Sequence, residues 1–315
     1  MSLADRTPPS PEEYLAYRER LSNWGRWGAE DELGTLNHLG AAERRRAAAL
    51  VREGRTISLA RPIDTRPSPL NPHPAQHMAS VGAATGLADF LGLFFHGFAQ
   101  THIDALSHIP GAGGRYFNDR PIGARTPALA MPEGTALGIQ RLREGIVGRG
   151  VLYDIPRLRG TAYVDAGAPV HGWDLEDAAR QAGFEPAAGD IVCLRSGRDE
   201  WLAAHPDWTG HSVPAGVHAS VCEFLFDTRA AMLCWDMLDA PTEDQGIPNP
   251  LDIDTPVHVH CIVIPVMGMP LLDNADLREL AAACRALDRS EFLFFAAPLV
   301  LDGGTGSPIN PIALL

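Results

Sequence analysis

Residues 100–108 of the chain have the sequence Gln-Thr-His-Ile-Asp-Ala-Leu-Ser-His. In an extended segment, side chains alternate between two faces, so His102, Asp104 and His108 project from the same face. A neutral imidazole beside a carboxylate is half of a site for a first-row metal, and the third side chain, His108, is suited to carry a proton. The simpler interpretation is the end of a strand with incidental polar residues, so the rest of the chain has to decide between the two.

Composition narrows the class of protein. The chain has 315 residues, 45% of them hydrophobic, and a formal net charge of -13, which predicts a globular protein and argues against binding to nucleic acid or to an anionic membrane. The five cysteines are an odd number without paired spacing, which favours buried thiols in a reducing compartment. The N-terminus is polar and no apolar run approaches the ~20 residues of a membrane span. A soluble cytoplasmic protein is the expectation.

The pattern of elements predicts an α/β fold with a mixed central sheet. Strands are expected at 56–60, 90–96, 150–155, 190–195, 231–235, 291–296 and 298–301. Helices are expected at 11–21, 41–53, 174–182 and 274–286. Because strands alternate with helices and no linker or repeat interrupts them, residues 1–315 are predicted to form a single domain.

Three blocks of sequence resemble the "putative cyclase" superfamily, which includes bacterial kynurenine formamidase and isatin hydrolase. They are residues 27–37, Trp-Gly-Ala-Glu-Asp-Glu-Leu-Gly-Thr-Leu-Asn, the core block 101–108, and residues 303–311, Gly-Gly-Thr-Gly-Ser-Pro-Ile-Asn-Pro. The first is typical of the longer members. The resemblance implies a swivelling β/α/β cyclase-like fold, a homodimer or homotetramer, and metal-dependent hydrolysis of an amide, formamide or lactam. Residues 1–50 would be an N-terminal extension used in oligomer contacts.

The resemblance also implies roles for individual residues. The family core reads His-x-Gly-Thr-His-x-Asp-x-Pro-x-His, in which the first two histidines and the aspartate hold Zn or Mn and the last histidine transfers protons. His102 and Asp104 match two metal ligands and His108 matches the acid/base. The first ligand position falls on Phe98, which cannot bind a metal. His96 has the same strand parity and is the replacement candidate if the backbone shifts, and the amide oxygen of Gln100 is a weaker one.

The second half of the site is expected from the C-terminal part of the chain. His258 and His260 form a His-x-His pair, a common metal arrangement, and are predicted to share one face of a strand. Spacing does not choose between them. Asp273 occupies the acidic position of the family, and it is equally suited to be the N-cap of the following helix.

Other polar and aromatic side chains are candidates for substrate binding. Each has a structural alternative: His218 a helix start, Asp236 the end of a buried strand, and Arg195 an ion pair with an acid. Phe95 and Phe98 suit a hydrophobic or aromatic substrate. The substrate-binding candidates are therefore Phe95, Phe98, Gln100, His218, Asp236 and Arg195.

Three functions follow from these residues. The first is a metal-dependent hydrolase of an amide, lactam or lactone in a hydrophobic or aromatic small molecule, with His108 as acid/base. The second is a metal-independent cyclase, dehydratase or isomerase of secondary metabolism, which the loss of a ligand at Phe98 favours. The third is a non-catalytic protein that binds small molecules on the same scaffold.

Overall fold

The structure is a computed structural model that describes residues 2–82, 86–121, 136–208, 215–247 and 257–315. Its centre is a mixed nine-stranded sheet, counted over these residues, in the order β1-β13-β11-β7-β8-β9-β10-β4-β12. These strands are β1 (Thr56–Ser58), β4 (His102–Asp104), β7 (Ile146–Asp154), β8 (Ile191–Arg195), β9 (Met232–Trp235), β10 (Leu271–Asp273), β11 (Glu291–Ala296), β12 (Gly306–Pro308) and β13 (Ile312–Leu314). The prediction of an α/β fold with a mixed sheet is confirmed.

Strands β7 to β10 run parallel to one another, while β4 is antiparallel to both of its neighbours, β10 and β12. Five-residue β8 is buried along its whole length, as expected for a parallel strand covered on both faces. Val192 and Leu194 enter one apolar cluster and Ile191 and Cys193 enter another. The alternation of side chains along each strand therefore feeds two cores, one on each face of the sheet.

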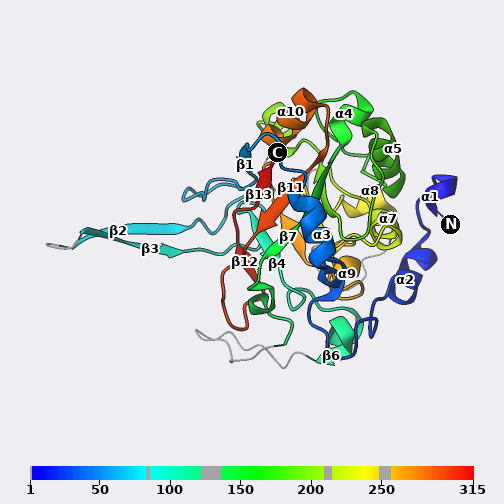
Figure 1. Cartoon of the computed structure of the whole chain (residues 1–315), viewed down its shortest axis with the longest axis horizontal. Helices are drawn as coiled ribbons and strands as arrows, with labels where there is room; N and C mark the ends of the chain where they lie inside the picture. Colours follow the sequence, from blue (N-terminus) through cyan, green and yellow to red (C-terminus); the bar gives the residue numbers. More distant parts are fainter. Residues whose placement is uncertain (1, 83–85, 122–135, 209–214, 248–256) are drawn as a thin grey trace.

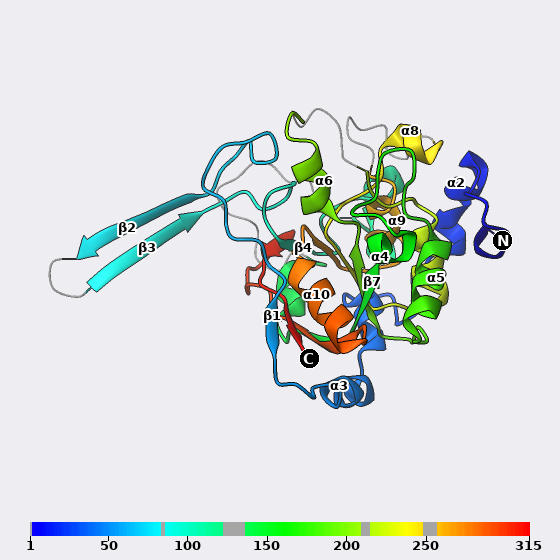
Figure 2. The ribbon, with the colours of Figure 1, turned by 90° about the horizontal axis from the view of Figure 1, so that it is seen from above.

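Helices cover both faces (Figure 2). Leu175 of α5 and Leu225 of α7 belong to one core, and Leu280 of α10 belongs to the other. The α-helices are α1 (Ser2–Asp5), α2 (Pro11–Arg20), α3 (Ala41–Ala48), α4 (Ile155–Arg159), α5 (Gly172–Ala182), α6 (Arg198–Ala204), α7 (Val221–Asp227), α8 (Thr242–Gln245), α9 (His260–Val263) and α10 (Arg278–Leu287). Short 3₁₀ helices cover Gly34–His38, Ala112–Gly114, Phe117–Asp119 and Ile139–Leu142. Among the helices of the described residues, none is long and apolar enough to cross a membrane.

The N-terminal segment packs on its own chain. Ser10 caps α2 through a reciprocal capping box with Glu13, an arrangement that satisfies two free backbone donors at the start of the helix. Tyr14 and Tyr17 are buried, and the Tyr14 hydroxyl donates a hydrogen bond to the carbonyl oxygen of His258. The use of residues 1–50 in oligomer contacts, and the single-domain organisation, stay predictions.

One expected strand lies outside the body of the protein. Residues 90–96 do not form a buried strand: β3 (Gly86–Gly92) pairs with β2 (Gln76–Gly82) as an antiparallel hairpin that projects from the body (Figure 1). A second, shorter antiparallel hairpin is formed by β5 (Arg115–Tyr116) and β6 (Arg120–Pro121). The apolar character of residues 90–95 predicted burial, but no residue of the hairpin belongs to an apolar core among the residues that the structure describes.

Three smaller predictions also fail. Residues 258–260 are not a strand, because the chain turns there and α9 starts at His260. The last helix starts at Arg278 rather than at residue 274, so Asp273 is not its N-cap but the last residue of β10. Residues 298–301 form no strand.

Candidate metal centre

Five side chains from four parts of the chain meet at the centre of the site, and we call them the His–Asp cluster: His96, His102, Asp104, His260 and Asp273. Asp104 and His102 stand at the two ends of β4, whose register with β10 places Asp273 opposite His102. β12 flanks β4 on its other side. His260 comes from the start of α9. The short strand β4 therefore carries ligand-type side chains to the point where the chain's distant parts converge.

The cluster contains two groups of three ligand-type atoms, and Asp104 belongs to both. Potential ligand atoms of His96, His102 and Asp104 lie within 4.8 Å of one another, and so do those of Asp104, His260 and Asp273. His102 Nε2 is 3.5 Å from Asp104 Oδ1, and His260 Nε2 is 3.7 Å from Asp104 Oδ2. A carboxylate with one oxygen facing each group is suited to bridge two cations.

The Asp104 carboxylate is buried without a compensating hydrogen bond from the described residues. Its side chain is fully buried, and neither oxygen accepts a well-aligned hydrogen bond from the described residues. Burial alone would raise the pKa of this carboxyl, but the neighbouring His108, His96 and His102 lower it. A buried, ionised carboxylate without hydrogen-bond donors costs several kcal/mol unless a positive charge compensates it. The residues present therefore fit a divalent metal.

Hydrogen bonds orient the histidines of the cluster. His102 Nδ1 lies 2.9 Å from the carbonyl oxygen of Gln100, which can only accept, so Nδ1 carries the proton and Nε2 faces Asp104 and Asp273. His260 Nδ1 is 2.5 Å from Asp239 Oδ2. Burial would lower the pKa of His260, but Asp239 and Asp273 hold it well above its usual value. Fixing one ring nitrogen in this way is how proteins aim the other at a metal.

His96 enters the cluster through a bend in the chain. Gly97 has a φ of +133°, which favours glycine. Asn274 Nδ2 donates hydrogen bonds to the carbonyl oxygens of Gly97 and Gln100, at 2.6 and 2.9 Å. His96 Nε2 is 3.0 Å from Thr305 Oγ1, in the C-terminal block. The bend brings His96 to the cluster, whereas the Phe98 carbonyl oxygen accepts a hydrogen bond from Arg198.

His108 lies beside the cluster. Its ring stacks on His96, with centroids 3.8 Å apart and planes 3° from parallel, and its Nε2 is 3.7 Å from Asp104 Oδ2. Burial lowers the pKa of His108 to about 4, against the opposing effect of Asp104. The imidazole is therefore neutral at pH 7 and able to accept a proton.

His258 and His218 lie outside the cluster. His258 Nδ1 is 3.1 Å from Gln245 Nε2, and its ring packs edge-on against Tyr14. His218 contacts Ser220 Oγ and the carbonyl oxygen of Gln245 at 3.1 and 3.2 Å. Of the two histidines that spacing left open, the structure places His260 in the cluster. The contacts of His218 match its structural alternative near the start of α7.

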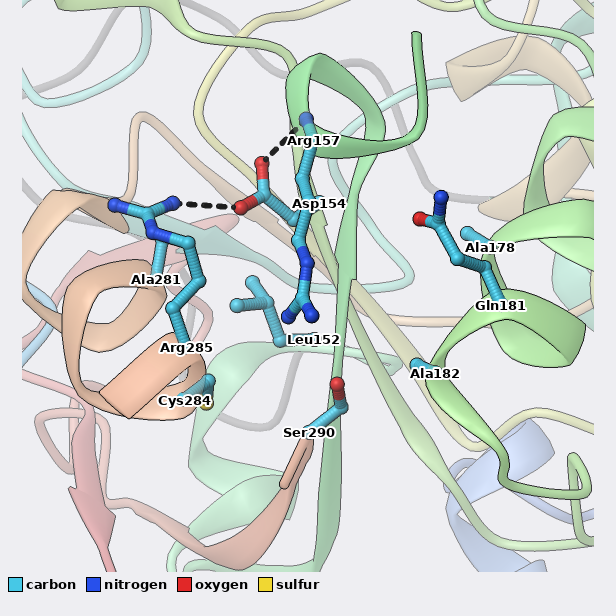
Figure 3. A pocket seen from close by; sticks show the side chains of 10 residues that line it. All are labelled: Leu152, Asp154, Arg157, Ala178, Gln181, Ala182, Ala281, Cys284, Arg285 and Ser290. Atoms are coloured by element: carbon cyan, nitrogen blue, oxygen red, sulfur yellow. Dashed lines mark hydrogen bonds and ion pairs between the residues drawn. The ribbon is translucent and has the colours of Figure 1, made fainter. Parts of the chain in front are cut away.

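Asp236 and Arg195 also have structural partners. Asp236 accepts hydrogen bonds from the backbone N–H groups of Ser196, Gly197 and Arg198, so it closes the N-terminus of α6. Arg195 donates to Asp154 and Glu200. Asp154 also accepts from Arg285 and from the backbone of Arg157 beside a cavity of about 20 Å³, shown in Figure 3. That volume holds about one water, so this cavity is too small for a substrate.

Aromatic and amide candidates lie closer to the cluster. The Phe95 ring packs on His96 and His102, with centroids 4.6 and 6.2 Å apart. Gln100 is buried, donates to the Asp64 carbonyl oxygen at 3.3 Å, and leaves its own amide oxygen without a partner among the described residues. Phe95 is thus the candidate that places an apolar surface next to the histidines.

Sequence reasoning missed several residues that hold the cluster. Trp235 Nε1 donates to Asp273 Oδ1, and Asp239 holds His260. Asp239 follows β9 by a few residues, as Asp236 does, and that position after a buried strand was its available signal. Arg198, 4% exposed, contacts Asn274 and lines a cavity of about 390 Å³ with Ala99 and Arg61. No signal in the sequence marked Arg198 or Asn274.

Comparison with known proteins agrees with this architecture. The family model described as "Putative cyclase" matches residues 57–241. A crystal structure described as a novel cyclase is 28% identical, with a TM-score of 0.79, and the match covers 95% of this chain and 99% of that one. No curated protein matches the sequence significantly.

Two isatin hydrolase structures share the fold at lower identity. One, bound to the product analogue thioisatinate, has a TM-score of 0.55 at 19% identity over 89% of this chain and 98% of that one. Isatin hydrolase A from Ralstonia solanacearum has a TM-score of 0.53 at 16% identity over 82% and 91%. These two show the fold alone. Since the family model covers more than half of the sequence, the chain belongs to the cyclase family.

Proposed function

We propose that the chain is a metal-dependent hydrolase of an amide, lactam or lactone bond in a hydrophobic or aromatic small molecule. The observation that carries the proposal is the buried Asp104 carboxylate, which accepts no well-aligned hydrogen bond from the described residues and belongs to both ligand groups. His96, His102 and Asp104 would hold one ion of Zn or Mn, and His260 and Asp273 would join Asp104 around a second. The presence of isatin hydrolases among proteins of this fold agrees with the reaction class.

A divalent metal bound there supplies a Lewis acid and lowers the pKa of a water toward ~7. The chain's own residues do the rest. His108, neutral at pH 7, accepts a proton from the attacking water at Nε2 and returns it to the leaving nitrogen or oxygen. Phe95 offers the reacting carbonyl's aromatic or aliphatic substituent an apolar surface beside His96.

The metal-independent alternative loses the observation that favoured it, because His96 brings a third ligand-type atom to His102 and Asp104. In this proposal Phe98 has no ligand role, and His96, two residues earlier in the chain, supplies the ligand that the family pattern places at that position.

Elemental analysis of the purified protein, combined with hydrolysis assays, tests the proposal. We expect bound Zn or Mn, chelator-sensitive opening of aromatic lactams such as isatin or of aromatic formamides and lactones, and loss of both properties in Asp104→Asn. Asp244→Asn is the control, because the Asp244 side chain contacts no residue of the His–Asp cluster among the described residues and accepts a hydrogen bond only from the Gly167 N–H. Chelator-insensitive turnover would support the metal-free reaction instead. Metal binding without turnover of any of these classes would support the non-catalytic alternative.

A further inference from the structure

A cavity of about 390 Å³ lies between the loop that follows β1 and helix α6. Ala99, in the bend that brings His96 to the His–Asp cluster, borders it as well. No described residue that lines the cavity belongs to the cluster itself. Pockets of roughly 300–1,000 Å³ accept small organic molecules, so this cavity is large enough for a ligand of its own.

Positive side chains dominate the lining of this cavity. Among the lining residues that the structure describes, three are arginines, Arg61, Arg66 and Arg198, and one is acidic, Asp64. The whole chain has a formal net charge of -13, so the charge of the cavity is opposite to that of the protein. A cleft lined by one sign of charge raises the local concentration of ions of the other sign. The charge therefore indicates an anionic ligand.

Two of the three arginines already pair with carboxylates. Arg61 Nη1 and Nη2 donate to the two oxygens of Asp199, at 2.8 and 2.9 Å. Arg61 Nε also donates to the carbonyl oxygen of Asn274, at 3.1 Å. Arg66 is exposed, and its Nε lies 3.5 Å from Asp64 Oδ1. These contacts compensate the charge of both side chains within the chain.

Arg198 is a buried cation without an ion pair in the part of the chain that the structure describes. It is 4% exposed, and its guanidinium donates to the side-chain oxygen of Asn274 and to the carbonyl oxygen of Phe98. Burial, and then repulsion from Arg61, lowers the pKa of Arg198 to about 9, so the group is still positively charged at pH 7. A buried charge without a counter-charge is strongly unfavourable, and an anion in the cavity would supply one.

We propose that this cavity binds the carboxylate or phosphate group of a small molecule, and that Arg198 pairs with the anion. A guanidinium has five N–H donors in a planar fork, and those not used by Asn274 and Phe98 can meet the oxygens of an anion. Leu70 and Leu202 offer the rest of the ligand an apolar surface. This inference does not depend on the hydrolytic reaction proposed above.

The cavity is connected to the candidate metal centre through Asn274. Arg198 donates to Asn274 Oδ1, while Asn274 Nδ2 donates to the carbonyl oxygens of Gly97 and Gln100 in the bend that positions His96. A single side chain therefore separates the bound anion from that bend. The anion can be the acidic group of a substrate that extends toward the cluster, or it can belong to a separate small molecule. The same guanidinium serves both.

Isothermal titration calorimetry of the full chain with benzoate, inorganic phosphate and the neutral benzamide tests the site. We expect at least one of the two anions to bind, benzamide to bind more weakly than benzoate, and Arg198→Gln to lower the affinity for the anion by about 10-fold or more. Thr65→Asp adds a negative charge at an exposed position of the lining and should weaken binding without disturbing a buried contact. Arg52→Gln is the matched control, because Arg52 is an exposed arginine outside the lining.

Several results would overturn the proposal. They are the absence of binding of both anions, equal affinities for benzoate and benzamide, and a loss in Arg52→Gln equal to that in Arg198→Gln. Binding that disappears in Asp104→Asn but survives in both Arg198→Gln and Thr65→Asp would place the anion on the metal centre instead. If Arg198→Gln does not fold, which its circular dichroism spectrum would reveal, Thr65→Asp decides.

A kinetic comparison identifies the source of the anion. If the acidic group belongs to the substrate, 4-formamidobenzoate should have a lower KM than the neutral formanilide, and Arg198→Gln should remove the difference. If it belongs to a separate molecule, the two substrates should have equal KM values, and benzoate should bind without competing with formanilide. Absence of hydrolysis would contradict the proposed function alone, because the calorimetric result does not require turnover.

Discussion

His96 Nδ1 lies 3.0 Å from Asp104 Oδ1, although the family spacing assigns the first ligand position to Phe98. The chain reaches this arrangement through a bend at Gly97, held by Asn274. His96 therefore takes the place beside Asp104 that the spacing gave to Phe98. This shift of two residues is possible because Asn274 ties down the intervening backbone.

The substitution His96→Ala should lower metal affinity by about 10-fold to 100-fold or more. It removes one of the three ligand-type atoms in the group formed by His96, His102 and Asp104. Phe98→Ala is the matched control and should keep the metal, since the Phe98 side chain has no ligand atom and its contact with Arg198 is made by the backbone carbonyl oxygen. Competition with a chromophoric chelator measures both. Metal loss in Phe98→Ala with retention in His96→Ala would contradict the assignment.

Asp239→Asn should reduce metal affinity by about 10-fold to 100-fold without unfolding the protein. Asp239 touches the far nitrogen of His260, and replacing its carboxylate with an amide weakens the hold on that ring and lowers its basicity. A metal titration followed by calorimetry gives the affinity. Asp239→Glu should recover part of it, whereas a purely structural role would show equal thermal destabilisation and unchanged affinity.

Asp236→Ala should destabilise the fold by about 2 kcal/mol or more, because three backbone N–H groups at the start of α6 lose their acceptor. The free energy of unfolding in urea measures the change. Asp227→Ala, at an exposed position at the end of α7, should stay within about 0.5 kcal/mol of the wild type. A stable Asp236→Ala protein with impaired turnover would instead favour substrate binding.

Acid should destabilise the protein through His218. Burial lowers the pKa of His218 to about 4, from an ordinary value of 6.5. Between these values the unfolded chain binds a proton that the folded chain does not, so stability is complete above pH 6.5 and falls as the pH drops toward 4. The shift corresponds to at most about 3 kcal/mol. The free energy of unfolding, measured in urea at several pH values from 7 to 4, should fall less steeply with decreasing pH in His218→Asn than in the wild type. An equal pH dependence in the two proteins would contradict this origin.

Much of the sheet follows from sequence because its central strands are continuous apolar runs. Residues 191–195 and 232–235 are buried on both faces, and such runs predict strands with little ambiguity. His102 and Asp104 likewise lie together as their spacing suggested, whereas spacing left His258 and His260 open and the structure brings His260 to them. These are local signals, readable without knowledge of the neighbouring elements.

The predictions that were wrong depended on contacts between distant parts of the chain, which the local sequence does not reveal. The run at residues 90–95 has core composition but lies on and just beyond the exposed β2–β3 hairpin. Apolar composition alone therefore does not decide whether a segment is buried. Asp273 has N-cap chemistry, yet its pairing with His102 in the sheet decides its role. The bend that brings in His96 depends on Asn274, far away in the chain, and no spacing rule encodes it.

The pairing of β4 with β12 and of β1 with β13 joins early segments of the chain to its last strands. During synthesis, the parallel strands β7 to β9 can form before the strands on either flank find their partners. Thr305, which holds His96, also arrives only with these last strands. The His–Asp cluster can therefore reach its full set of contacts only after Thr305 has been synthesised and β12 has paired with β4.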